Sequence, residues 1–293
     1  MNPFLERLQS GDVLVADGAT GTNLQKMGLA PGIPPEDLVF DRPEMLLELE
    51  GAFVAAGVDI LLTCTFGGTR IRMKDSQYRD RVADVNRRAV ELTREAALAR
   101  AGVIVGGSIG PTGALLKPYG PLDLQEAMNA FKEQAQALAE GGVDLFVIET
   151  QFAMDEAIAA FEAVRSVSDL PVVVSFSYDR GTRTMMGVKP ADVVEKFRDK
   201  GAAMIGANCG TSLENMRTVV QEYASAVPGT PLWVKPNAGL PQIEGDRTVF
   251  DVSPDEMAVF AGDYIKMGAG VVGGCCGTTA EHIAAIARVV KSA

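Results

Sequence analysis

Eight short apolar runs alternate with longer amphipathic stretches along the chain, and this alternation constrains the fold more than any other feature. The runs are residues 13–16, 59–64, 103–110, 144–150, 172–177, 203–210, 232–239 and 270–277. They are rich in Val and Ile and show little period-two alternation, which is typical of parallel strands buried on both faces. Eight strand-then-helix units in 293 residues predict an α/β protein with a (β/α)₈ TIM barrel fold.

Helical patterns separate the apolar runs. Five of these patterns have clear ends and cover residues 123–141, 154–166, 190–200, 254–267 and 279–291. A doubly wound open sheet is the alternative architecture, but DGATGT stands after the first run where that fold would place its GxGxxG phosphate loop. Since no linker-like segment interrupts the pattern, we predict a single domain over residues 1–293.

Three long segments follow the first, third and seventh runs without a helical pattern. They cover residues 26–43, 110–121 and 236–251, and we expect all three to be loops. In a (β/α)₈ barrel the segments that follow the strands lie at the carboxyl-terminal face, where the active sites of this fold are built. The sequence therefore predicts a functional mouth framed by these three loops.

Charge and composition exclude several classes of function. Lys and Arg number 27 against 38 Asp and Glu, and the resulting net charge of −11 disfavours binding to nucleic acid or to an anionic membrane surface. No apolar run approaches the ~18 residues of a membrane span, and the N-terminus lacks a signal-peptide pattern. A single His rules out sites with two His ligands from one chain, and four Cys are too few for a disulfide scaffold. We therefore expect a cytoplasmic protein.

Three of the four cysteines stand at the ends of predicted strands: Cys209 in ANCG, and the pair Cys275 and Cys276 in GGCCGT. Both strand ends open on one barrel mouth, so the three sulfurs can converge there. The pair can share one metal only if the backbone leaves extended geometry, which the flanking glycines permit. Three thiolates with one open position are the pattern of a catalytic zinc site. A redox dithiol is the alternative, but the CxxC spacing is missing. Cys64 is expected to be an inert core residue.

Seven motifs, in order along the chain, resemble those of the homocysteine S-methyltransferase family. They are DGATGT (17–22), TCTFGG (63–68), GSIGPTG (107–113), IET (148–150), ANCG (207–210), KPNAGLP (235–241) and VVGGCCGTT (271–279). That family includes the homocysteine-binding module of cobalamin-dependent methionine synthase and the betaine– and S-methylmethionine–homocysteine methyltransferases. The resemblance covers nearly the whole chain and implies the same barrel fold.

The resemblance also implies a zinc-dependent methyltransferase. Cys209, Cys275 and Cys276 would be the catalytic metal ligands and hold one Zn²⁺ per chain, and this metal would bind the sulfur of homocysteine. A free thiol has a pKa of ~8.5 and is mostly protonated at neutral pH, whereas a metal-bound thiol is deprotonated. The resulting thiolate would attack an activated methyl group and give methionine.

Polar groups at the predicted mouth are candidates for holding the amino acid part of the substrate. The resemblance associates Asp17 and Glu149 with the ammonium group of homocysteine. A turn of three residues after the first run offers backbone N–H groups to the carboxylate. Polar residues at the ends of the fourth, sixth and seventh runs complete the set. The residue in the seventh run, Asn237, is placed to approach the zinc or the methyl donor. Besides the two acids, the substrate-binding candidates are Gly18, Ala19, Thr20, Thr150, Asn208 and Asn237.

The methyl donor is predicted from the motifs and from the scarcity of aromatic residues. The motifs GPTG and KPNAGLP are closer to the methionine synthase module than to the betaine enzyme. A cationic donor needs an aromatic or anionic cradle, and only Phe66, Tyr119 and Phe176 offer rings near the predicted mouth. We therefore expect methylcobalamin on a corrinoid-binding partner protein, with a folate-binding partner, to supply the methyl group in trans.

Three other interpretations of these residues remain open. The first is direct transfer to homocysteine from a small donor, either S-methylmethionine or betaine. The second is a non-catalytic zinc- or thiol-binding subunit of a larger complex. The third is a lyase or aldolase that forms a Schiff base, for which Lys235 is the candidate nucleophile.

Overall fold

The structure is a computed structural model that describes residues 2–245 and 247–292. Met1, Asp246 and Ala293 are not described, so both ends of the predicted domain 1–293 and one residue of the predicted loop 236–251 lie outside the described residues.

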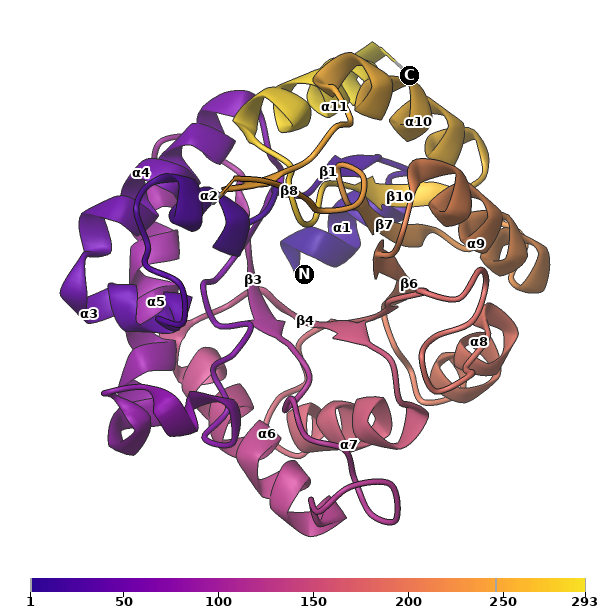
Figure 1. The fold of residues 1–293 in the computed structure, drawn as a ribbon. Coiled ribbons are helices and arrows are strands. Elements are labelled where there is room, and N and C mark those ends of the chain that lie inside the picture. The colour runs from indigo at the N-terminus through magenta and orange to yellow at the C-terminus, as the bar shows by residue number, and fades with distance from the viewer. Residues whose placement is uncertain (1, 246, 293) are drawn as a thin grey trace.

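A nearly closed barrel of parallel strands surrounded by helices makes up the described chain (Figure 1). The strands are β1 (Leu14–Val15), β2 (Ile60–Leu62), β3 (Ile104–Ile109), β4 (Leu145–Gln151), β5 (Val172–Phe176), β6 (Met204–Cys209), β7 (Leu232–Pro236) and β10 (Ala269–Val272). They pair in the order β1-β10-β7-β6-β5-β4-β3-β2. A parallel bridge between Ala16 and Ile60 brings β1 beside β2. The predicted (β/α)₈ barrel is therefore confirmed.

Helices cover the outside of the sheet, and the ends of several follow from local sequence. The main helices are α4 (Pro43–Ala56), α5 (Val82–Ala97), α6 (Leu124–Gly141), α7 (Met154–Arg165), α8 (Pro190–Arg198), α9 (Leu213–Ala226), α10 (Pro254–Lys266) and α11 (Ala280–Ser292). The Ser253 side chain accepts a hydrogen bond from the Glu256 N–H and so caps α10, whose first residue is Pro254. Gly142 ends α6 in the left-handed conformation at φ 89°, which glycine adopts at little cost.

Two of the segments expected to be loops contain regular structure, which corrects the prediction. Segment 26–43 contains the 3₁₀ turn η1 (Pro35–Asp37) and the short helix α3 (Leu38–Asp41), which follow the short helix α2 (Gly21–Lys26). Pro35 at the first position favours a helical turn there because its φ is already fixed near the helical value. Segment 236–251 contains the antiparallel strands β8 (Gln242–Glu244) and β9 (Arg247–Val249), which lie over the mouth in Figure 1. The 3₁₀ turns η2 (Arg72–Asp75) and η3 (Arg79–Arg81) precede α5.

The N-terminal end of the barrel is filled by an element that the strand count does not predict. Helix α1 (Pro3–Gln9) places Phe4 in a buried cluster with inward-facing residues of the strands, among them Leu14, Leu145 and Trp233. The Asn2 side chain donates a hydrogen bond to the carbonyl of Asp144 and anchors the start of this helix. The barrel is therefore packed with side chains at its N-terminal end.

Gly206 shows how closely β6 and β7 approach each other. A Cβ atom at this position would lie 1.9 Å from the carbonyl oxygen of Trp233. We expect Gly206→Ala to push the two strands apart and to lower the free energy of unfolding by about 1–3 kcal/mol. Urea denaturation measures this. Gly51→Ala in α4, where a Cβ has open space, is the control and should raise stability by about 0.5–1 kcal/mol. Equal stability of Gly206→Ala and the native chain would contradict this packing.

No helix among the described residues is long and apolar enough to cross a membrane.

Candidate metal and substrate site

A cavity of about 400 Å³ opens at the carboxyl ends of the strands. Its strand side is formed by residues at the strand ends, including Asp17, Glu149 and the three cysteines of ANCG and GGCCGT. Its loop side is formed by Gln25, Pro35, Glu36, Phe66 and Arg72, which lie beyond the strand ends. Residues of seven different strands or their ends thus meet in one chamber, as expected for the mouth of a barrel.

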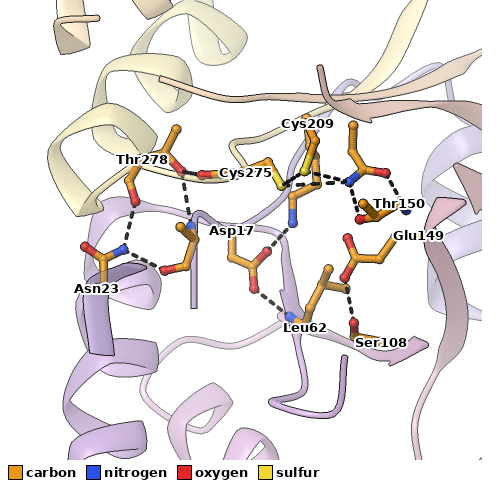
Figure 2. Close-up of polar contacts among 12 residues, drawn as sticks. Asp17, Asn23, Leu62, Ser108, Glu149, Thr150, Cys209, Cys275 and Thr278 are labelled. Atoms are coloured by element: carbon orange, nitrogen blue, oxygen red, sulfur yellow. Dashed lines mark hydrogen bonds and ion pairs between the residues drawn. The ribbon is translucent and has the colours of Figure 1, made fainter. Parts of the chain in front are cut away.

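The sulfur atoms of Cys209, Cys275 and Cys276 converge on the strand side. All three lie within 4.8 Å of one another, and the Cys209 and Cys275 Sγ atoms are 2.8 Å apart (Figure 2). Strand β10 ends at Val272, so the cysteine pair follows the strand in a turn, where the Cys275 N–H donates to the Pro236 carbonyl at 2.8 Å. The departure from extended geometry that a shared metal requires is therefore present.

A single buried amide, Asn208, ties this cluster to two other strands. Its Oδ1 accepts from the Thr150 N–H at 2.8 Å and from the Ser175 hydroxyl at 2.7 Å. Its Nδ2 donates to the Thr150 hydroxyl at 2.7 Å and contacts the Sγ atoms of Cys209 and Cys275 at 3.6 and 3.8 Å. Asn208 does not line the cavity. Its amide therefore positions the sulfurs from outside the cavity.

Backbone strain occurs at the same strand ends. Thr150 and Cys209 have φ values of 61° and 58°, in the left-handed region that non-glycine residues rarely adopt. Such a conformation costs on the order of 1–3 kcal/mol and persists only where the surroundings hold it. The Asn208 side chain bonds both the N–H and the hydroxyl of Thr150, so it stabilises this geometry.

Hydrogen bonding within the cluster favours a thiolate. Contacts from Cys209 and then Cys275 lower the pKa of Cys276 to about 3. The hydrogen bonds of Cys209 with Cys275 and Cys276, and then its burial, raise the pKa of Cys209 well above its usual range. The thiolate is the form of cysteine that ligates metals, and the lowered pKa of Cys276 favours this form.

The donor set fits a borderline-soft divalent metal. Sulfur ligands favour zinc over magnesium or calcium, which take oxygen ligands. Three convergent sulfurs leave one position of a tetrahedral site open. All three cysteines line the cavity, so that position is accessible from it. The cluster can therefore hold a metal ion with room for one ligand from the cavity.

Asp17 and Lys235 form a buried ion pair on the floor of the cavity. The Lys235 Nζ donates to the Asp17 Oδ1 at 2.6 Å, and the Leu62 N–H donates to the Asp17 Oδ2 at 2.8 Å (Figure 2). Burial alone lowers the pKa of Lys235, but the carboxylates of Asp17 and Glu149 outweigh burial and raise this pKa above its ordinary value. The ammonium of Lys235 therefore stays protonated, which argues against a Schiff-base nucleophile.

Glu149 offers a carboxylate to the cavity. Its Oε1 accepts from the Ser108 hydroxyl at 2.6 Å, and its other oxygen has no hydrogen-bond partner among the described residues (Figure 2). Burial raises the pKa of Glu149 to about 7, against the opposing effect of Lys235. Both oxygens of Asp17 are engaged, so Glu149 is the acid of the predicted pair with an oxygen left for a ligand.

The turn after β1 is held against the cysteine loop by Thr278. The Ala19 N–H donates to the Thr278 hydroxyl at 3.1 Å, and this hydroxyl donates to the Cys275 carbonyl at 2.7 Å. The Asn23 side chain donates to the carbonyls of Ala19 and Thr278 at 2.6 and 2.8 Å (Figure 2). Because the Ala19 N–H already has a partner, the predicted carboxylate contacts fall mainly to its neighbours Gly18 and Thr20, which line the cavity.

The remaining candidates divide between the cavity and its surroundings. Thr150 lines the cavity, whereas Asn237 does not. The Asn237 Nδ2 donates to the Gly210 carbonyl at 2.9 Å, and its buried Oδ1 has no partner among the described residues. Cys64 is 4% exposed and has no part in the sulfur cluster, as expected of a core residue.

Sequence reasoning named Phe66 but missed the other residues on the loop side, above all Glu36 and Arg72. Both come from the segments 26–43 and 63–81, in which no periodic pattern singles them out. The Glu36 carboxylate accepts a hydrogen bond from the N–H of Gly67, which belongs to the TCTFGG motif. The requirement for glycine in that motif was the available signal, since a Cβ at Gly67 would lie 2.8 Å from the Glu36 Oε1.

Solved structures with the same fold span nearly the whole chain. The homocysteine methyltransferase MmuM from Escherichia coli, in its metallated form, is 23% identical with a TM-score of 0.83, and the match covers 98% of this chain and 99% of that one. Its oxidized form gives 24% identity and a TM-score of 0.81, with the same coverage. A methyltransferase from Methanosarcina mazei is 12% identical with a TM-score of 0.62, covering 99% of this chain and 97% of that one. These similarities support the barrel fold.

The sequence itself carries the family assignment. A model of the homocysteine S-methyltransferase family matches residues 14–290, from β1 to the last helix, and includes every motif quoted above from the strand ends. The resemblance seen in the motifs is confirmed by this match. The chain therefore belongs to the homocysteine S-methyltransferase family of methyltransferase enzymes.

Proposed function

We propose that the chain is a zinc-dependent homocysteine S-methyltransferase whose methyl donor is a methylcorrinoid protein supplied in trans. The observation that carries this proposal is the meeting of three sulfurs and the Glu149 carboxylate in one cavity of about 400 Å³. The family assignment supplies homocysteine as the substrate class, and the metallated form of E. coli MmuM supports a metal. Four free cysteines suit a reducing compartment, so we also propose a cytoplasmic location.

Cys209, Cys275 and Cys276 would hold the zinc, and Asn208 would keep two of their sulfurs in place through its amide group. Bound zinc supplies a Lewis acid that keeps a coordinated thiol deprotonated at neutral pH. Of the residues that line the cavity, Glu149 would bind the ammonium of homocysteine, and the N–H groups of Gly18 and Thr20 would bind its carboxylate.

The chemistry is a displacement at a methyl carbon. The thiol proton of homocysteine leaves to solvent as the substrate binds. A lone pair of the substrate sulfur then forms the bond to the methyl carbon, and the bond from that carbon to its carrier breaks with its electron pair remaining on the carrier. The residues of the cavity contribute by orienting the sulfur towards the mouth, from which the methyl group arrives.

The mouth favours a large donor over a small cation in an aromatic cage. Of the three rings expected there, Tyr119 is 73% exposed and Phe176 is fully buried in the core, so neither lines the cavity. Exposed apolar side chains lie on the segments that follow β1, β3, β5 and β7, which leave their strands at the carboxyl-terminal face of the barrel. These are Ile33, Leu115, Tyr119, Met185, Met186, Leu240 and Ile243. Exposed apolar side chains at this face are suited to docking a protein that carries the methyl group.

Methionine formation tests the proposal. The zinc-loaded chain would be mixed with homocysteine and, in separate reactions, with methylcobalamin, methyltetrahydrofolate plus a corrinoid protein, S-methylmethionine, or betaine. We expect transfer from the corrinoid donors. Rapid turnover with a small donor and none with a corrinoid would replace the proposed donor. No methionine from any donor would instead favour the non-catalytic zinc-binding subunit.

The raised pKa of Glu149 predicts a pH-dependent affinity for amino acids. Only the ionised carboxylate attracts an ammonium group, and with a pKa of about 7 it is lost progressively as the pH falls through neutrality. Methionine, which has no thiol proton, should therefore bind up to about tenfold more weakly for each pH unit below that value. Calorimetric titration at several pH values measures this. A flat profile for the native chain, or an unaltered slope in Glu149→Gln, would contradict the assignment.

A further inference from the structure

Arg72 occupies an unusual position on the loop side of the cavity. Its guanidinium carbon lies 5.3 Å from the centre of the Phe66 ring, so the charged group stacks over that ring. Within the part of the chain that the structure describes, the guanidinium makes no hydrogen bond and no ion pair. Its charge acts on the Glu36 and Glu156 carboxyl groups and opposes the rise in their pKa that burial causes, and the side chain lines the cavity, where this charge can attract or repel a ligand.

Phe66 and Glu36 would form a cation site if Arg72 were absent. Phe66 is the only aromatic residue among the described residues that line the cavity, and Glu36 lines the same side. The Glu36 carboxylate is 5% exposed and is fixed by the Gly67 N–H. An aromatic face next to a carboxylate is the arrangement that binds sulfonium and quaternary ammonium groups. The Arg72 side chain therefore fills the cradle that a cationic methyl donor would need.

The position of Arg72 is supported by the loop opposite. A Cβ at Gly113, in the GPTG motif, would lie 2.8 Å from the Arg72 Nη1, so only a residue without a side chain leaves room for the guanidinium. The same loop is fixed by Glu156, whose Oε1 accepts from both the N–H and the hydroxyl of Thr112 at 2.7 and 2.6 Å. The guanidinium thus lies in a space shaped by both sides of the cavity.

We propose that Arg72 is a specificity-determining residue that excludes cationic methyl donors by occupying the Phe66–Glu36 cradle with its own positive charge. A sulfonium or quaternary ammonium group would have to displace the guanidinium or approach it, and like charges at close range repel. A methyl carrier without a positive charge beside the methyl group escapes this penalty. This inference rests on the proposed function. It narrows the methyl donor to carriers that have no positive charge beside the methyl group.

Binding and turnover of simple cations test the inference. Tetramethylammonium is an unreactive probe of the cradle, and its affinity is measured by calorimetry. Arg72→Ala should bind it at least about tenfold more tightly than the native chain, whereas Arg72→Lys, which keeps the charge, should not. Arg183→Ala, an exposed arginine after β5 that does not line the cavity, is the matched control and should equal the native chain. Zinc content, measured in parallel, should be unchanged in all variants.

Methyl transfer to homocysteine gives the second readout. In Arg72→Ala, methionine formation from trimethylsulfonium and from S-methylmethionine should both become faster. The factor should be of the same order as the increase in tetramethylammonium affinity. If turnover from S-methylmethionine falls while that from trimethylsulfonium is unchanged, Arg72 anchors a donor carboxylate and the proposal is overturned. Equal tetramethylammonium affinity in Arg72→Ala and the native chain overturns it as well. Because tetramethylammonium binding needs no reaction, it decides the role of Arg72 even if no donor yields methionine.

Discussion

Cys276→Ala should lose the bound metal and all measurable methionine formation. Hydrogen bonds from Cys209 and Cys275 lower the pKa of the Cys276 thiol, so the cluster can supply the thiolate that a metal requires. With two sulfurs remaining, a tetrahedral site lacks a protein ligand, and affinity for zinc should fall by orders of magnitude. Zinc content by mass spectrometry and methionine formation by chromatography are the two measurements, and the native chain should hold about one zinc ion.

Cys64→Ala is the matched control for this experiment. Cys64 is a buried cysteine that also lines the cavity, but it lies outside the sulfur cluster. Its loss should leave zinc content at the native level. Full zinc content in Cys276→Ala would remove this residue from the metal site and would leave the three-cysteine assignment without support.

Glu149→Gln should weaken homocysteine binding by about 10–150-fold while zinc remains bound. The substitution keeps the size of the side chain and its contact with Ser108 but removes the charge that we propose binds the substrate ammonium. Losing a hydrogen bond to a charged group costs roughly 1.5–3 kcal/mol, which corresponds to this range. The Michaelis constant for homocysteine and the dissociation constant for methionine both report the effect, and kcat should change less than either.

Glu50→Gln separates the loss of a charge at the site from the loss of any buried carboxyl group. Glu50 in α4 is 5% exposed, does not line the cavity, and accepts a hydrogen bond from Thr93 at 3.0 Å. Burial raises the pKa of Glu50 well above its ordinary value and so favours the neutral acid, which its amide replacement resembles. Homocysteine affinity should be native in this variant. If Glu149→Gln is also native in affinity, the ammonium site lies elsewhere.

The barrel and the sulfur cluster could be predicted because each has a local signal. Continuous apolar runs of four to eight residues mark buried parallel strands, and a cysteine pair within glycines marks a loop bent for close approach. The barrel topology then brings the two cysteine-bearing strand ends to one mouth, although 66 residues separate Cys209 from Cys275. Fold class and metal-site candidates therefore follow from pattern and topology together.

The partners of the acidic residues could not be predicted, because they depend on contacts between distant segments. Asp17 was expected to face the substrate, yet both its oxygens are engaged, one of them by Lys235 at a separation of 218 residues. No periodicity in the sequence indicates which charged groups will pair inside a mouth. The same holds for Arg72 and Phe66, whose stacking depends on the space left by Gly113 in another loop.

The packing of helix α1 into the N-terminal end of the barrel bears on the order in which substrates would bind and products would leave. Phe4 packs among side chains inside the N-terminal end of the barrel, and the chamber is lined by residues at the opposite, carboxyl-terminal ends of the strands. In the proposed reaction, homocysteine and the methyl donor would both enter from the carboxyl-terminal side, so homocysteine would bind before the donor arrives. Methionine would form beside the sulfurs at the mouth and would leave after the proposed carrier has withdrawn. A barrel that is packed at one end would thereby favour an ordered binding of two substrates and an ordered release of two products.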